Sequence, residues 1–201
     1  MPRPYFLKNL LVLAVWGTCV PLDAGARETE PVAGPAPSAH FHPQGQPPSP
    51  ATVALQRSAR SSLPFEDQRD FEESRRGFIA APAYTEIKTA EGTTAWNFGR
   101  YAFLDTGQAF DSINPSLQRQ AVLNAQFGLY EVVPGRIWQV RGFDISNITF
   151  VKGDSGWIVF DPLVSKETAA AALAFANEKI GARPVVAVIY SHSHIDHFGG
   201  V

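Results

Sequence analysis

The segment that decides the fold is Pro184-Val185-Val186-Ala187-Val188-Ile189-Tyr190 followed by Ser191-His192-Ser193-His194-Ile195-Asp196-His197. The unbroken apolar run is typical of a strand that is covered on both faces of an α/β sheet. Histidines and an aspartate follow at its carboxyl end, where open α/β sheets place their ligand crevices. We therefore predict an α/β fold with a functional site directly after this strand.

The residue types in this turn point to metal chemistry. Imidazole nitrogens and carboxylate oxygens suit Zn²⁺ and similar divalent ions. On a turn that leaves a buried strand, His192 and His194 can address one ion, while Asp196 and His197 address a second. Two ions about 3.5–4 Å apart can share a water and lower its pKa. A solvent-exposed histidine cluster is the simpler alternative, but the complete His-x-His-x-Asp-His pattern favours a metal site.

Residues near the turn have supporting roles in this hypothesis. Asp161, which ends the predicted strand over 157–160, is a candidate for orienting one of the ligands. An aspartate before a proline is also an ordinary strand terminator, and the sequence leaves both roles open. We expect Gly199 and Gly200 to let the backbone pass close to the ions.

Regular elements are predicted before the apolar strand. A helix is expected from the capping residue Ser165 to Gly181, because its apolar and small residues recur at helical spacing. Before it, a meander of strands is expected over 136–140, 147–151 and 157–160. Further upstream we predict a short polar helix that ends at Gly77, an irregular aromatic-rich stretch with short strands over 78–113, and a helix that starts at Asn114-Pro115 and ends at Gly128.

The amino-terminal region has the composition of an exported protein. Basic residues, an apolar run over 10–20 and Ala24-Gly25-Ala26 predict a signal peptide over 1–26. The apolar run is far shorter than the roughly 20 residues that cross a bilayer, so we expect no stable membrane anchor. Cys19 is the only cysteine, so cleavage would leave a thiol-free chain, which suits an oxidising compartment. We expect a periplasmic or secreted protein.

The chain divides into four expected parts. After the signal peptide come a Pro-rich linker over 27–62, an N-terminal arm with short helices over 63–130, and a partial α/β domain over 131–201. His40 and His42 lie in the linker, where we expect them to be solvated. The formal net charge is −2, without any block of like charge, so no nucleic-acid partner is expected.

The motif resembles that of the metallo-β-lactamase superfamily, and the element order resembles the first half of its αββα sandwich, here preceded by an irregular N-terminal arm. Four further stretches are similar to the secreted alkylsulfatases that degrade detergents such as dodecyl sulfate. These stretches lie within residues 70–80, 114–120, 139–147 and 156–163. Because the similarity covers residues 63–201, it involves much more than the metal motif.

This resemblance implies a site with two zinc ions, in which His192 and His194 are ligands of one ion and Asp196 and His197 are ligands of the other. The family completes the site with two glutamates and a further histidine located downstream, followed by a helical dimerisation domain and a sterol-carrier-like domain. None of these segments lies within the 201 residues. We therefore expect an N-terminal fragment of a longer protein that forms a homodimer.

The function implied is hydrolysis of primary alkyl sulfate esters, such as dodecyl sulfate, to alcohol and sulfate. Asp196 would also be catalytic, because it can accept a hydrogen bond from the bridging water. A lactamase or a thioesterase could use the same metal motif, but the flanking stretches argue against both. For the isolated chain, we expect a truncated metal-binding fragment without catalytic activity.

Overall fold

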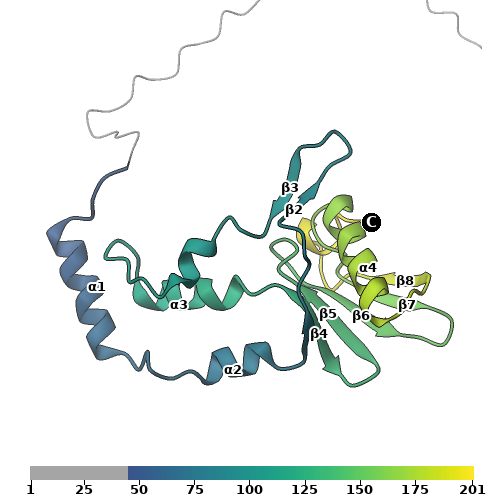
Figure 1. Ribbon diagram of the computed structural model, residues 1–201, viewed down its shortest axis with the longest axis horizontal. Helices are drawn as coiled ribbons and strands as arrows, with labels where there is room; N and C mark the ends of the chain where they lie inside the picture. Colours follow the sequence, from purple (N-terminus) through teal and green to yellow (C-terminus); the bar gives the residue numbers. More distant parts are fainter. Residues whose placement is uncertain (1–44) are drawn as a thin grey trace, which may run out of the picture. The chain divides into compact units, whose positions relative to one another are not determined.

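The computed structural model describes residues 45–201 (Figure 1). Gln46–Val201 form one compact unit. The expected signal peptide over 1–26 and the first part of the linker, including His40 and His42, lie outside the described residues. Among the helices of the described part, none is long and apolar enough to cross a membrane.

A mixed sheet of six strands is the centre of the unit, in the order β1-β4-β5-β6-β7-β8. The strands are β1 (Phe78–Ala80), β4 (Gly128–Val133), β5 (Ile137–Arg141), β6 (Ile148–Lys152), β7 (Trp157–Phe160) and β8 (Val185–Ile189). All neighbours are antiparallel except β7 and β8, which pair in parallel. A parallel pair needs a crossover, and helix α4 (Lys166–Ile180) supplies it. The prediction of an α/β fold is confirmed.

Helix α4 packs its small residues against the sheet, beside β6, β7 and β8 (Figure 1). Ser165 caps the helix as predicted, because its Oγ accepts a hydrogen bond from the amide of Thr168 at 3.3 Å. The main core cluster joins both layers and includes the sheet residues Val140, Phe150 and Trp157 and the helix residues Ala172, Phe175 and Ala176. Trp157 is fully buried and donates from Nε1 to Oδ1 of Asn177 at 2.8 Å. This packing fixes the carboxyl-terminal part of the helix over the start of β7.

The sheet crosses the boundary that we placed between arm and domain at residue 130. Strand β4 contains that residue and pairs with both β1 and β5. Gly128, which ends the helical stretch in the sequence, opens β4 instead. A Cβ at this position would lie 2.5 Å from the carbonyl oxygen of Ala80, so the close approach of β1 requires glycine there. The aromatic-rich arm is therefore part of the same folded unit.

The remaining elements are α1 (Pro50–Ser62), α2 (Arg69–Arg75), β2 (Glu86–Lys88), β3 (Thr94–Asn97), the 3₁₀ helix η1 (Ala102–Thr106) and α3 (Pro115–Asn124). Helices α2 and α3 confirm the two predicted helices of the arm. Helix α1 corrects the linker prediction, which ran to residue 62. Ser49 accepts a hydrogen bond from the amide of Thr52 and Pro50 occupies the first turn, so the last proline of the Pro-rich stretch starts a helix.

Strand β8 is where its apolar run predicts a strand, but its burial differs from the expectation. It is the last strand of the sheet and pairs with β7 alone. Val186 is 50% exposed and Val188 is 40% exposed, so within the described residues the strand is not covered on both faces. The apolar run of β8 indicates that both faces of the strand suit burial, but it does not predict which segment covers them.

Candidate metal centre

The candidate site is the histidine turn, which we define as residues 191–200, directly after β8. It contains the short 3₁₀ helix η2 (Ile195–His197). At its start, the amide and hydroxyl of Ser191 donate to the two carboxylate oxygens of Asp161, both at 2.7 Å. At its end, the amide of Gly200 donates to the carbonyl of Leu163 at 3.1 Å. Both ends of the turn are thus fixed to the loop that follows β7.

The two glycines of the turn lie against the loop that follows β7. A Cβ on Gly199 would lie 2.2 Å from the carbonyl oxygen of Val164, and one on Gly200 would lie 2.0 Å from that of Pro162. The backbone therefore needs glycine to pass close to the loop after β7. The contacts that require glycine are with protein atoms.

The four predicted ligands are brought together as two pairs. Nε2 of His192 lies 3.0 Å from Nδ1 of His194. Oδ2 of Asp196 lies 3.2 Å from Nε2 of His197. In a tetrahedral zinc site with bonds of about 2.0–2.1 Å, two ligand atoms are roughly 3.3 Å apart. Each pair therefore has a spacing at which its two atoms can share one ion.

The pairs do not merge into a larger cluster. Within residues 45–201, no group of three or more His, Cys, Asp or Glu side chains is placed to hold a single ion. The ring centroids of His192 and His197 are nevertheless only 3.9 Å apart, so the two pairs are neighbours. The donor chemistry suits zinc-like ions, and each pair offers two donor atoms to an ion.

Asp161 takes a position from which it can orient His197. Its Oδ2 lies 3.0 Å from Nδ1 of that ring, while the other ring nitrogen faces Asp196. The contact does not have hydrogen-bond geometry, and Nδ1 is buried without a hydrogen-bond partner. A carboxylate behind a histidine is the usual support of a metal ligand. Asp161 also ends β7, so its position suits both of the roles that the sequence left open.

The carboxyl of Asp161 is ionised more easily than usual. Burial raises its pKa, but hydrogen bonds from the amide and hydroxyl of Ser191, together with the imidazole of His197, outweigh burial and hold the pKa below its ordinary value. The negative charge of Asp161 lies at Nδ1 of His197 and favours an orientation of this ring in which Nε2 can face a cation.

Two supporting residues were missed by the sequence analysis. Oγ of Ser146 donates to the carbonyl oxygen of Asp196 at 2.5 Å, and the amide of Ser146 donates to Asp144 at 2.9 Å. Both side chains are buried. They lie between β5 and β6, within one of the stretches that carries the family resemblance, but no local pattern shows that this loop contacts the histidine turn.

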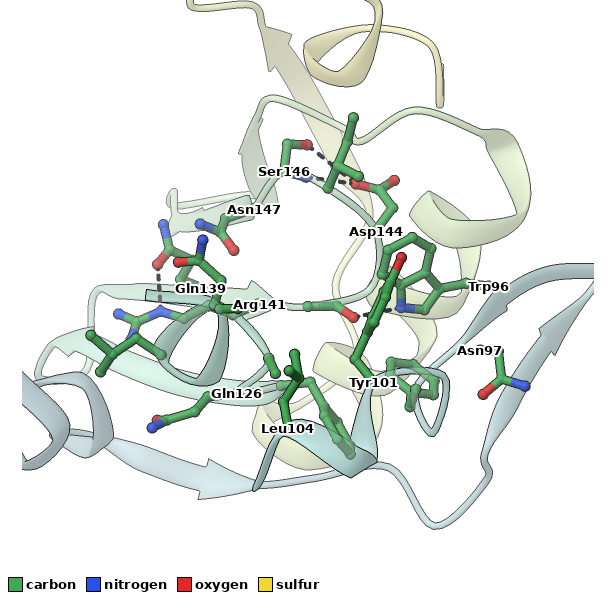
Figure 2. A pocket seen from close by; sticks show the side chains of 18 residues that line it. Trp96, Asn97, Tyr101, Leu104, Gln126, Gln139, Arg141, Asp144, Ser146 and Asn147 are labelled. Carbon is green, nitrogen blue, oxygen red and sulfur yellow. Dashed lines mark hydrogen bonds between the residues drawn. The ribbon is translucent and has the colours of Figure 1, made fainter. Parts of the chain in front are cut away.

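A cavity of about 730 Å³ adjoins this loop (Figure 2). Figure 2 shows Trp96 and Tyr101 on one side of it and Gln139, Arg141 and Asn147 on another. None of the four candidate ligands lines it. Ser146 lines the cavity and also contacts Asp196, so the cavity and the histidine turn are neighbours.

Comparison with known proteins identifies relatives for this arrangement. Residues 141–201 match the metallo-beta-lactamase superfamily. An (R)-specific secondary-alkylsulfatase from Pseudomonas is 48% identical over 155 residues, which cover 77% of this chain and 23% of that protein. A linear primary-alkylsulfatase from Pseudomonas is 45% identical over 157 residues, covering 78% of this chain and 23% of the relative. The alkyl/aryl-sulfatase BDS1 of Saccharomyces cerevisiae is 40% identical over 152 residues, covering 76% and 23%.

The fold agrees with these sequence relatives. The solved structure of the stereoselective inverting sec-alkylsulfatase Pisa1 from Pseudomonas superposes with a TM-score of 0.73, at 48% identity, over 77% of this chain and 24% of that one. The chain therefore spans about a quarter of the length of the relatives it matches. Over about three quarters of its length the chain has the sequence and fold of alkylsulfatases, and its residues 141–201 match the metallo-beta-lactamase superfamily.

Proposed function

We propose that the protein to which these residues belong hydrolyses alkyl sulfate esters to an alcohol and inorganic sulfate. The observation that carries the proposal is the pairing of His192 with His194 and of Asp196 with His197 at the carboxyl end of β8. Relatives named alkylsulfatases, at 40–48% identity over about three quarters of the chain, support the choice of substrate class.

Each residue has a defined part in this proposal. His192 and His194 hold one zinc ion, Asp196 and His197 hold the second, and residues outside this chain complete both coordination shells. When bound, the ions lower the pKa of a water and offset the charge that builds up on the sulfate ester. Asp196 accepts a hydrogen bond from the attacking water, and Asp161 keeps His197 in the orientation that leaves its Nε2 facing Asp196.

Primary alkyl sulfates, with dodecyl sulfate as the first to test, are the proposed substrates. Relatives of similar identity include one named for primary and one named for secondary alkyl sulfates. A comparison of dodecyl sulfate with a secondary isomer such as octan-2-yl sulfate tests this directly. A higher kcat/KM for the secondary ester would contradict the primary preference and leave the sulfatase proposal intact.

We also propose that the bond cleaved is C–O. The solved relative is described as inverting, and inversion at carbon requires that water attack the carbon atom. Hydrolysis in ¹⁸O-labelled water should then place the label in the alcohol. Label in the sulfate would show attack at sulfur and contradict this part of the proposal.

The experiment that tests the function measures sulfate release from dodecyl sulfate, with and without a chelator, together with the zinc content per chain. It should be made on this chain and on a protein of the relatives' length that contains it. We expect the longer protein to be active, to lose activity to the chelator, and to be inactivated by His192→Ala. The matched control is His42→Ala, a histidine outside the motif, which should retain activity. Release that persists in chelator or in His192→Ala would refute the proposal.

For the 201-residue chain alone, we propose weak metal binding without catalysis. Two ligands per ion hold zinc less firmly than the four of a closed tetrahedral site. Full activity with two zinc ions in the isolated chain would contradict this. It would mean that residues within the 201 complete the site.

Export and assembly are further parts of the proposal. The sequence of residues 1–26 supports cleavage after Ala26 and release to the periplasm or the medium. The family resemblance supports a homodimer for the complete protein. Mass spectrometry of the secreted protein and its mass in solution test the two points separately.

A further inference from the structure

A cluster of buried polar residues lies beside the histidine turn. Four polar side chains are buried within residues 45–201, and two of them, Ser146 (8% exposed) and Thr168 (1%), hydrogen-bond to a third, Asp144 (6%). Burying a carboxylate is unfavourable unless donors surround it, so such a residue needs a structural or functional reason. Figure 2 shows the carboxylate of Asp144 beside Ser146.

The buried carboxylate of Asp144 is surrounded by hydrogen-bond donors. Its Oδ1 accepts a hydrogen bond from the amide of Ser146 at 2.9 Å. Its Oδ2 accepts from the amide of Val164 at 2.8 Å and from the hydroxyl of Thr168 at 2.9 Å. These donors come from the loop between β5 and β6, the loop after β7 and the first turn of α4. One carboxylate therefore connects three segments that are distant in the sequence.

The cluster contacts the histidine turn in two ways, first through Ser146. The Ser146 hydroxyl has a single proton, and its two possible acceptors are the Asp196 carbonyl at 2.5 Å and Oδ1 of Asp144 at 3.4 Å. The shorter contact identifies the Asp196 carbonyl as the acceptor. Asp144 holds the backbone of Ser146, and the side chain of Ser146 holds the backbone of Asp196.

The second contact between the cluster and the histidine turn runs through the loop after β7. Asp161 and Leu163 have φ angles of 53° and 67°, in the left-handed region that non-glycine residues seldom adopt. Such strain persists only where the surroundings impose it, and it is common near functional sites. Asp144 holds this loop through the amide of Val164. The loop in turn contacts the histidine turn through Asp161 and through the Leu163 carbonyl.

We propose that Asp144 is a positioning residue for the candidate metal site. Through Ser146 it fixes the backbone at Asp196, and through Val164 it fixes the strained loop that presents Asp161 to His197. Capping of α4 does not account for these contacts, because Ser165 already provides the cap. The inference rests on the proposed function only in so far as the histidine turn binds metal.

Ser146→Ala is the variant that tests the proposal, because it removes the hydroxyl donor and leaves Asp144 in place. In the metal-free chain, we expect the amides of His197 and Gly199, which are hydrogen-bonded within the turn, to exchange with deuterium at least tenfold faster. In the protein that binds zinc, competition with a chromophoric chelator should show affinity that is lower by roughly 10–100-fold, the usual loss when a group behind a ligand is removed.

Matched variants separate positioning from a general loss of stability. Ser146→Thr keeps the hydroxyl and should restore both exchange protection and zinc affinity. Ser155→Ala, in the exposed turn between β6 and β7, should change neither. Thr168→Val removes one donor to Asp144 with little change of shape and should show a smaller loss than Ser146→Ala. Amides in β5 and β6 should keep wild-type exchange in all four variants.

Unchanged exchange of the turn amides in Ser146→Ala would overturn the proposal, as would equal acceleration throughout the sheet. These outcomes are independent of the proposed function. If the protein carrying this chain neither binds zinc nor releases sulfate, the proposed function fails, but the exchange measurement still decides whether Asp144 and Ser146 fix the turn.

Discussion

Replacement of Gly200 by alanine tests how tightly the histidine turn must pack. The added Cβ would lie 2.0 Å from the carbonyl oxygen of Pro162, 2.8 Å from that of Ser165 and 2.7 Å from the Cβ of Ala169. Two of these neighbours are backbone atoms and cannot rotate away. Gly200 does not have a left-handed φ angle, so alanine meets a steric obstacle there without backbone strain. The turn or the loop after β7 must therefore move.

The expected cost follows from these contacts. Overpacking of a closely packed site costs about 1–3 kcal/mol of unfolding free energy. Since replacing glycine by alanine stabilises by about 0.4–1 kcal/mol through the unfolded chain, the net loss should be about 1–2 kcal/mol. For a chain of this size, that corresponds to a melting temperature lower by roughly 2–8 °C. If the ligands move by about 1 Å with the turn, activity should fall by about 100-fold.

Urea unfolding followed by circular dichroism measures the first effect, and zinc competition and sulfate release by the longer protein measure the second. Gly99→Ala is the matched control, because its Cβ would approach only the side-chain oxygen of Asn97, at 3.4 Å. We expect the control to be as stable as the wild type and to bind zinc equally. A Gly200→Ala protein that matched Gly99→Ala in stability and zinc affinity would refute the reasoning, because the turn would then not be held against the loop.

Further substitutions test the hydrophobic core, the contact of Asp161 with His197, and the ion pair between Arg57 and Asp111. Trp157→Ala, at a fully buried position, should cost about 3–5 kcal/mol in urea unfolding, whereas Leu55→Ala, at a residue that is 66% exposed, should stay within about 0.5 kcal/mol. Asp161→Asn removes the charge behind His197 and should weaken zinc binding by roughly 10–100-fold in the competition assay; wild-type affinity would show that Asp161 only ends β7. The Arg57 guanidinium, hydrogen-bonded to Asp111 at 2.7 Å, holds the pKa of that carboxyl below its usual value, despite a smaller opposing effect of burial. A carboxyl whose pKa is lower in the folded state stabilises that state above the unfolded pKa of about 3.9. This stabilisation is lost as the pH falls through the lower pKa of the folded state. The protection factors of α1 amides, which are corrected for the intrinsic pH dependence of exchange, should therefore fall below about pH 4 in the wild type, and the same fall in Asp111→Asn would contradict this assignment.

The sequence predicted the elements that local chemistry controls. Capping residues and proline positions identified α3 and α4, because Asn114 and Ser165 satisfy free amides at helix starts within their own few residues. Strand-like runs on either side of the predicted turn at 153–156 identified β5, β6 and β7, and the apolar run before the histidines identified β8. The assignment of His192 with His194 and of Asp196 with His197 to separate ions stays a prediction.

Where the sequence failed, the information was nonlocal. The Pro-rich composition up to residue 50 hid the start of α1, and Gly128 was interpreted as a helix end although it opens β4. The exposure of β8 depends on its place at the edge of the sheet, which its own residues do not specify.

The sequence by itself determined the chemistry of the site: which side chains can bind a metal, and that they follow a strand. Only the tertiary structure decided what holds them. Ser146 and Asp196 are 50 residues apart, and Asp161 and Ser191 are 30 apart, so their contacts exist only because the sheet and the α4 crossover bring these loops together. Hydrogen bonds require atoms within about 3 Å, and the fold sets that proximity for residues distant in sequence.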